Sequence, residues 1–544
     1  MSWQRFGWPL AVVALVCGTT ALATRSPTAG RPTYNHSGDR TEEATAVAAR
    51  VDAELGRVWK AQGIVPADRA TDLAIYRRLS LALHGTVPSL EEVRRFEQDA
   101  RPDKLEQWTA GMLDDPRFAD YFAERLARAF VSVDGGQFLI FRRDRFTEWL
   151  SEQLRKRVPY DDMVRAMIGG EGVWTGQPEV NYVTQGYANE EFDHNKLAAR
   201  TVRAFLGQRI DCAQCHDHPF AEWKQAQFEG LAACFGQVKL TPIGLNDVAD
   251  QEYEIDDMSS ASGKRTVAPS VPYSKDWFPE GGSRRQRLAT WITHPDNQRF
   301  ERAIANRLWA LMFGKPFAAS RRVDDLPNPG DAESAGDLAV LDLLGADFRQ
   351  HGCDLRRTIQ VIAASQAFRM DSIHPTAEAD ELVKLEEHWG VFPLIRLRPE
   401  QVIGAMLQTN TVKTIDRNSH LFTRAIRFFR ERDFVNEFGD PGDAELQERP
   451  STIPQALLNL NGEFAQEMAQ VTPFSTPGRL RQMAPTPEAL LDDAFLVCLT
   501  RYPTPTERGT LLPTIQTEDG KTSGEGIQDL FWALFNSPEF SWNH

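Results

Sequence analysis

Cysteine and histidine, two common ligand residues for metals and haem, are scarce in this chain, at 6 and 11 of 544 residues. Basic residues are also fewer than acidic ones, 61 Lys and Arg against 76 Asp and Glu, which gives a formal net charge of −15. An excess of negative charge provides no overall attraction for nucleic acid or for anionic lipid. We therefore predict no nucleic-acid partner.

Long apolar runs are missing except near the N-terminus. Arg5 is the only charged residue among the first 24, and an apolar stretch from Trp8 to Cys17 is followed by Ala21-Leu22-Ala23. This pattern is typical of a signal peptide and its cleavage site, and the apolar stretch is shorter than the roughly 20 residues of a membrane span. We predict a signal peptide over residues 1–23, export to the periplasm or cell surface, and no span in the mature chain. An uncleaved signal that anchors the protein is the alternative.

The cysteines beyond Cys17 do not form the pattern of a disulfide framework, because they are odd in number and widely spaced. Cys498 lies in an apolar run and is expected to be a buried small hydrophobe. The chain also lacks a nucleophile elbow, a phosphate-binding loop and a zinc-protease helix, so whether it is an enzyme stays open. The five cysteines are Cys212, Cys215, Cys234, Cys353 and Cys498.

Helical patterns dominate the sequence after a flexible leader at residues 24–45. Ser89 and Glu92 form a capping box, and Thr486-Pro487 marks another helix start. Apolar residues recur at helical spacing, as in the series from Phe118 to Phe130. About 520 mature residues are too many for one core. We predict a mainly α, multi-helix, two-domain protein, with helical domains over 46–235 and 275–544.

The segment between these domains, residues 236–274, differs in composition. It is polar, rich in Val, Thr and Ser, and interrupted by Pro242 and Gly244. We predict a small β-element or irregular connector, with strands at 237–240 and 265–268 joined by an acidic loop over 247–257.

The strongest chemical signal is Cys212-Ala213-Gln214-Cys215-His216. Two cysteines at this spacing match the two vinyl groups of a haem, and the next histidine can bind the iron on its proximal side. With so few cysteines and histidines, the odds of a chance match are roughly one in a thousand. Export also suits c-type haem attachment. We predict haem c on Cys212 and Cys215, with His216 as the proximal ligand.

Three other interpretations stay open. The first is a redox Cys-x-x-Cys site, although such a site would not need His216 and no clear βαβ pattern surrounds it. Zinc could be bound by Cys212, Cys215, His216 and His218, although four ligands within seven residues strain a tetrahedron, and Cys234 or His194 could then complete the site. This would make the chain an exported metal-binding protein or hydrolase. A disulfide in the same turn would instead suit a non-catalytic cell-surface or assembly module.

The ligand on the far side of the iron would decide what a haem does. A second strong ligand makes an electron carrier, and an open position makes a binding or catalytic site. His218 is too near His216 to reach the same iron. His194, before the motif, and Met258, in the connector, are the candidates. The redox partner and the oligomeric state are not predicted.

A polar cleft is conceivable further along the chain, where Asn306 and Arg307 could meet Asp324, Asp325 and Asp331. Paired carboxylates can perform acid–base chemistry. Asp and Asn beside Pro and Gly more commonly form turns, and we favour that interpretation.

The segment from Ala198 to Phe220, together with residues 77–88, resembles the planctomycete cytochrome-type domain of unknown function. Residues 306–314, 396–400, 454–461 and 534–540 resemble its C-terminal partner domain. The resemblance covers about residues 50–544 and implies an exported, cytochrome-like protein without an established reaction. Larger relatives carry an extra cytochrome domain and a carbohydrate-binding-like insertion. This chain has one Cys-x-x-Cys-His motif and no room for that insertion, which argues against a multihaem wire and a sugar-binding role.

Overall fold

The computed structural model describes most of the chain in several stretches. The predicted signal peptide, almost the whole leader, Asp331 and the segment 454–461 lie outside them. The described residues are 44–133, 141–188, 191–219, 222–241, 244–258, 260, 262–318, 322–330, 338–415, 446, 463–473 and 475–544.

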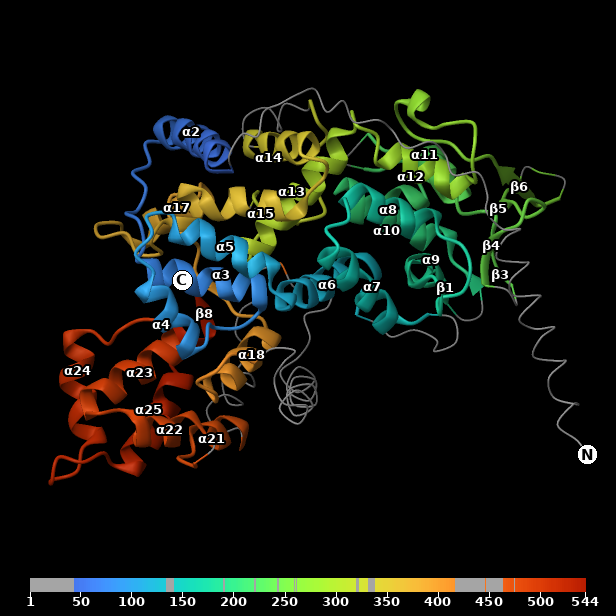
Figure 1. Cartoon of the computed structure of the whole chain (residues 1–544). Coiled ribbons are helices and arrows are strands. Elements are labelled where there is room, and N and C mark those ends of the chain that lie inside the picture. Colours follow the sequence, from blue (N-terminus) through green and yellow to red (C-terminus); the bar gives the residue numbers. More distant parts are fainter. Residues whose placement is uncertain are drawn as a thin grey trace, which may run out of the picture.

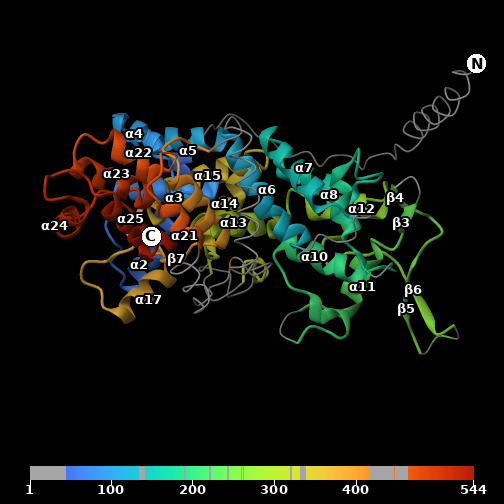
Figure 2. The same ribbon diagram turned by 90° about the horizontal axis from the view of Figure 1, so that it is seen from below.

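The described chain is mainly helical, as predicted, and elongated (Figures 1 and 2). The C-terminal helices lie at one end and two β-hairpins at the other. The first half contains α2 (Ala44–Gln62), α3 (Asp72–His84), α4 (Leu90–Gln98), α5 (Lys104–Asp114), α6 (Pro116–Val131), α7 (Arg143–Arg155), α8 (Tyr160–Gly169), α9 (Asn181–Thr184), α10 (His194–Leu206) and α11 (Gln225–Ala233).

The second half begins with α12 (Arg284–Ile292), α13 (Gln298–Phe313), α14 (Ala339–Gln350), α15 (Leu355–Ala364), α16 (Gln366–Arg369), α17 (Ala379–Glu387) and α18 (Pro399–Thr409). The C-terminal helices are α21 (Glu463–Ala469), α22 (Thr476–Met483), α23 (Pro487–Leu499), α24 (Pro505–Leu511), α25 (Gly524–Phe535) and α26 (Pro538–Ser541). None of the described helices is long and apolar enough to cross a membrane.

Local signals in the sequence place several helix starts. The Ser89 side chain accepts a hydrogen bond from the Glu92 N–H at 3.2 Å, and Glu92 accepts one from the Ser89 N–H at 2.9 Å. Thr486 caps α23, directly before a proline. The capping box and the proline start are therefore confirmed, because each satisfies backbone donors that a helix end leaves free.

The predicted connector contains two antiparallel hairpins. Strand β3 (Val238–Thr241) pairs with β4 (Gly244–Asp247), and β5 (Tyr253–Asp256) pairs with β6 (Lys264–Val267). Strands occur near both predicted positions, but they belong to different hairpins, and β5 occupies the stretch expected to be an acidic loop. Alternation of Tyr253 and Ile255 with acidic residues allows one face of β5 to pack inward. Two shorter pairs are β1 (Tyr187–Ala188) with β2 (Glu191–Phe192) and β7 (Ile395–Arg396) with β8 (Trp542–Asn543).

The main hydrophobic core includes residues from both sides of the connector. One buried cluster consists mostly of residues from Val47 to Phe392, with Leu446 and Leu496 added, because α13 packs against both α3 and α10. A second cluster is built mostly by residues 397–540 and includes Leu81 of α3. The two helical segments separated in sequence by the hairpins therefore fold around a shared core.

Glu301 on α13 gives this shared core a pH-dependent stability. The residue is 5 % exposed, and its carboxylate forms an ion pair with Arg349 at 2.9 Å. Burial raises the pKa of Glu301 to about 7. The folded state therefore holds a proton that the unfolded chain releases near pH 4.5. Stability from this group is present at low pH and is lost as pH rises through the interval from about 4.5 to about 7.

We expect Glu301→Gln to raise the free energy of unfolding by about 1–3 kcal/mol near pH 8 and to change it little near pH 4. The amide keeps an acceptor for Arg349 and removes the buried charge. Chemical denaturation of both proteins at the two pH values measures the difference. Glu148→Gln is the control, since that side chain is 67 % exposed. An equal effect of Glu301→Gln at both pH values would contradict the assignment.

Candidate haem-attachment site

The Cys-x-x-Cys-His motif lies in the short link between α10 and α11. Gly207 ends α10 with a φ of +64°, and a 3₁₀ turn, η2 (Asp211–Gln214), carries the first cysteine. A left-handed residue is a common helix stop, and glycine adopts that conformation without strain. The space is also tight, because a Cβ at position 207 would lie 3.1 Å from the Cβ of Ala303. The chain therefore leaves α10 at a defined point and presents the motif immediately afterwards.

Both cysteines of the motif are accessible. Cys212 and Cys215 are exposed free thiols, whereas Ala213 between them is fully buried. Ile210, just before the turn, is also fully buried. The buried residues fix the turn against the body of the protein, so the two thiols stay at the surface within reach of an incoming group.

His216 is exposed and presents one ring nitrogen for coordination. Its Nδ1 lies 2.7 Å from the backbone carbonyl oxygen of Asp217. Because a carbonyl only accepts hydrogen bonds, Nδ1 must carry the proton, and in the neutral ring the lone pair is then on Nε2. Metal-binding histidines commonly have this arrangement, in which a hydrogen bond from one nitrogen orients the other. The three residues of the motif thus fit the chemistry of a c-type haem.

The segment after the motif is tied to the start of α11. The Asp217 carboxylate accepts a hydrogen bond from the Gln225 N–H at 3.0 Å and pairs with Lys224 at 3.1 Å. The hydrogen bond, followed by the lysine, lowers the pKa of Asp217. The His218 N–H donates to the Trp223 carbonyl at 2.8 Å, and the Trp223 side chain is buried. These contacts tie Asp217 and His218, which directly follow His216, to Trp223 and the start of α11.

A segment from the second half of the chain packs directly against the approach to the motif. The Leu326 N–H donates to the Gly207 carbonyl at 2.7 Å, and Arg209 donates through Nε and Nη2 to the two carboxylate oxygens of Asp324, each at 3.1 Å. Arg203 lies 3.5 Å from Asp324 and pairs with Asp211, the residue before Cys212, at 2.7 Å. This ion-pair network joins the second half of the chain to the attachment turn.

Asp324 and its neighbour Asp325 allow a matched test of this network. We expect Asp324→Asn to lower the free energy of unfolding by about 1–2 kcal/mol, because two partly buried guanidinium groups lose their shared carboxylate. Asp325 makes no ion pair within the described residues, and we expect Asp325→Asn to stay within about 0.5 kcal/mol of the unmodified protein. Urea denaturation measures both. Equal effects of the two substitutions would show that the Asp324 contacts contribute nothing specific.

The two predicted distal ligands belong to other elements than His216. His194 is the first residue of α10, and the motif follows the last, so a 13-residue helix, about 18 Å long, lies between them. Its ring packs between Phe192 and Tyr253, and burial lowers its pKa. Met258 is 97 % exposed at the tip of the β5–β6 hairpin. His194 and Met258 stay predictions for the far-side ligand.

The zinc ligands proposed from the sequence are not gathered into a metal site. Within the described ranges no three His, Cys, Asp or Glu side chains form a group suited to a metal ion. Cys234, a candidate fourth ligand, is buried, lies 3.5 Å from the Gly230 carbonyl, and has a pKa raised to about 12 by burial. Cys498 is fully buried in α23, as predicted.

The polar residues of the second half serve mainly as structural contacts. The Asn306 amide donates to the Val323 carbonyl at 3.0 Å and its oxygen accepts from the Phe317 N–H at 2.9 Å. Asp324 forms the ion pairs with Arg203 and Arg209 that are described above. These contacts match the favoured interpretation, in which the segment around Asp324 forms turns. Sequence reasoning missed Arg203 and Arg209, although two arginines and Asp211 flanking the motif were a visible signal of local ion pairs.

Comparison with protein families places this helical, two-part protein with its surface Cys-x-x-Cys-His turn. PSCyt2, described as a protein of unknown function (DUF1549), matches residues 50–240, which include the motif. PSD1, described as a protein of unknown function (DUF1553), matches residues 284–515. The chain therefore combines a PSCyt2 domain with a PSD1 domain, in the order expected from the sequence. No curated protein and no solved structure matches it.

Proposed function

We propose that this chain is an exported monohaem c-type cytochrome-like protein that transfers electrons in the periplasm or at the cell surface. The observation that carries the proposal is the geometry of the motif. Two exposed free thiols stand on one turn, and the adjacent His216 has its Nδ1 proton on a backbone carbonyl. The match to PSCyt2, a family of unknown function whose name hints at a cytochrome, agrees with the proposal.

Covalent attachment of haem would use Cys212 and Cys215 in the same type of reaction. Cys212 and Cys215 would each hold the haem through one thioether, formed by addition of the thiol S–H bond across one vinyl group, with sulfur on one carbon and hydrogen on the other. No atom is lost in either addition. Exposure of Cys212 and Cys215 makes the thiols accessible for this reaction, and the buried Ala213 keeps their turn in place.

His216 would hold the iron through Nε2, while the Asp217 carbonyl fixes the orientation of its ring. A bound haem supplies exchange of one electron at the iron. A surface position of the motif favours such exchange, because a partner protein can approach closely without entering the core. The Arg203, Arg209 and Asp324 network holds the preceding segment and so positions the turn.

The test is an absorption spectrum of the protein produced with a c-type haem maturation system. We expect a haem Soret band that stays with the polypeptide after denaturation, and a pyridine haemochrome typical of two thioethers. A colourless product would overturn the proposal. Zinc found in stoichiometric amount without iron would favour the metal-binding alternative, and a Cys212–Cys215 disulfide without haem or metal would favour the structural one.

A further inference from the structure

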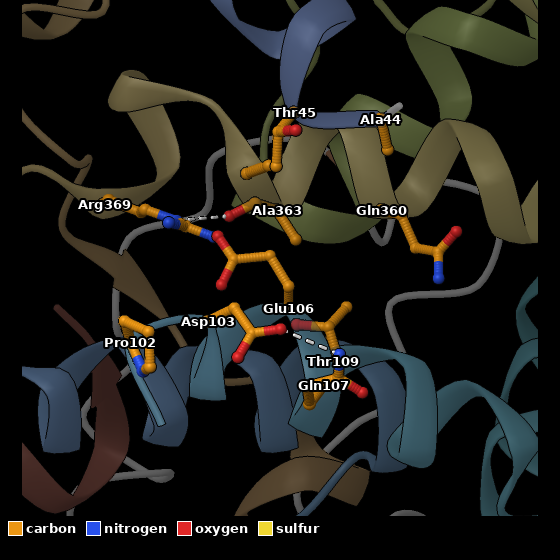
Figure 3. Close-up of a pocket in the computed structure, with 11 residues that line it drawn as sticks. Ala44, Thr45, Pro102, Asp103, Glu106, Gln107, Thr109, Gln360, Ala363 and Arg369 are labelled. Atoms are coloured by element: carbon orange, nitrogen blue, oxygen red, sulfur yellow. Dashed lines mark hydrogen bonds and ion pairs between the residues drawn. The ribbon is translucent and has the colours of Figure 1, made fainter. Parts of the chain in front are cut away.

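A cavity of about 590 Å³ lies far from the cysteine motif along the chain, between the start of α2, the first turns of α5 and the end of α15 (Figure 3). Its size falls within the range of small-molecule sites, which is roughly 300–1,000 Å³. One wall, residues 102–109, belongs to the PSCyt2 match, and the other, residues 360–369, belongs to the PSD1 match.

The cavity contains a pre-positioned arginine. The Arg369 guanidinium donates through Nε to the Ala363 carbonyl at 3.0 Å and through Nη2 to Glu106 at 2.9 Å. Its Nη1 makes no hydrogen bond to any other described residue. Two bonds thus hold the group in place and leave one nitrogen free to donate to a carbonyl or hydroxyl oxygen.

Negative charge exceeds positive charge among the residues that line the cavity. Glu106 and Arg369 neutralise each other, whereas the exposed Asp103 carboxylate accepts a hydrogen bond from the Gln107 amide at 2.9 Å, makes no ion pair within the described residues, and interacts at longer range with Arg101. Asp103 precedes α5 but makes no capping hydrogen bond with its side chain. Figure 3 shows Asp103 and Glu106 on one side of the cavity and Gln360 and Arg369 on the other. Among the charged residues that line the cavity, the balance is one negative charge.

We propose that this cavity binds a small polar organic amine, whose ammonium group pairs with Asp103 and whose carbonyl or hydroxyl oxygen accepts from Arg369. The Gln360 amide, which has no hydrogen-bond partner within the described residues, is placed to contact the same ligand. The site is separate from the Cys212–His216 motif and does not depend on haem.

Three probes of similar size and different charge test the proposal on the full chain. They are N-acetyl-lysinamide, N-acetyl-glutaminamide and the α-amide of N-acetyl-glutamate, which keeps a charged side-chain carboxylate. Isothermal titration calorimetry should show the cationic probe binding about tenfold more tightly than the neutral one, and the anionic probe more weakly than either. Equal affinities for the three probes, or no binding of the cationic probe, would overturn the proposal.

Paired variants locate the binding. Asp103→Asn should abolish the preference for the cationic probe, because it removes the lining carboxylate that makes no ion pair within the described residues. Asp250→Asn, which changes an exposed carboxylate that does not line the cavity, should leave the affinities unchanged. Preference for the cation that survives in Asp103→Asn would place the binding elsewhere and refute the assignment. Melting curves of both variants verify that they fold.

Discussion

Replacing both motif cysteines, Cys212→Ala with Cys215→Ala, is expected to abolish covalent haem in protein produced with a maturation system. Each single variant should keep one thioether, and its pyridine haemochrome band should move to longer wavelength because one vinyl group stays unsaturated. The physical reason is that each exposed thiol forms one of the two bonds. Haem stain after denaturing electrophoresis and the haemochrome spectrum measure the loss and the shift.

Cys234→Ala is the matched control for these variants. Cys234 lies close to the motif in sequence but is buried, with its pKa raised to about 12. We expect this variant to bind one haem through two thioethers, with an unshifted spectrum. Covalent haem at the original level in the double variant would mean that the attachment site lies elsewhere.

Arg78→Met is expected to cause the largest loss of stability among the substitutions considered, about 3–5 kcal/mol. Arg78 on α3 is 1 % exposed, and its guanidinium donates to the carbonyl oxygens of Phe368, Met370 and His544 at 3.0, 2.6 and 2.7 Å. It also stacks 3.8 Å from the centre of the Phe392 ring. One side chain therefore joins α3 to two distant segments, and its removal leaves buried carbonyl groups without donors.

Denaturant titration of Arg78→Met and of Arg57→Met separates the loss of this linkage from a general effect of removing an arginine. The Arg57 side chain is 75 % exposed, and its replacement should change the free energy of unfolding by less than about 0.5 kcal/mol. A value for Arg78→Met within about 1 kcal/mol of the unmodified protein would contradict the structural role.

Local patterns in the sequence were sufficient to predict the helical class and several details of it. The capping box at Ser89 and the burial of Cys498 depend on residues within a few positions of one another, so periodicity and capping rules reach them. The pairing within residues 236–274 was predicted less well. Short strands carry a weak signal, and the acidic residues around Tyr253 suggested a loop.

Contacts between segments that are distant in the sequence could not be predicted from local patterns. Arg78 and Arg77 stand in an apolar helix, which indicates buried charge, but the sequence does not reveal that their acceptors lie near residues 370, 498 and 540. The cavity beside Arg369 is lined by three segments, whose lining residues reach from 44 to 369, and no local pattern joins them. The sequence shows that Asp324 is polar, but it does not show that Arg203 and Arg209 are its ion-pair partners.

The intact mass of the denatured protein tests haem attachment at Cys212 and Cys215 most directly. Thiol addition to vinyl groups loses no atoms, so the mass should equal that of the mature polypeptide plus one haem. Peptide mapping should place the added mass on the peptide that contains Cys212 and Cys215. A mass equal to the bare polypeptide, or one lower by the two hydrogens of a disulfide, would contradict the proposed function.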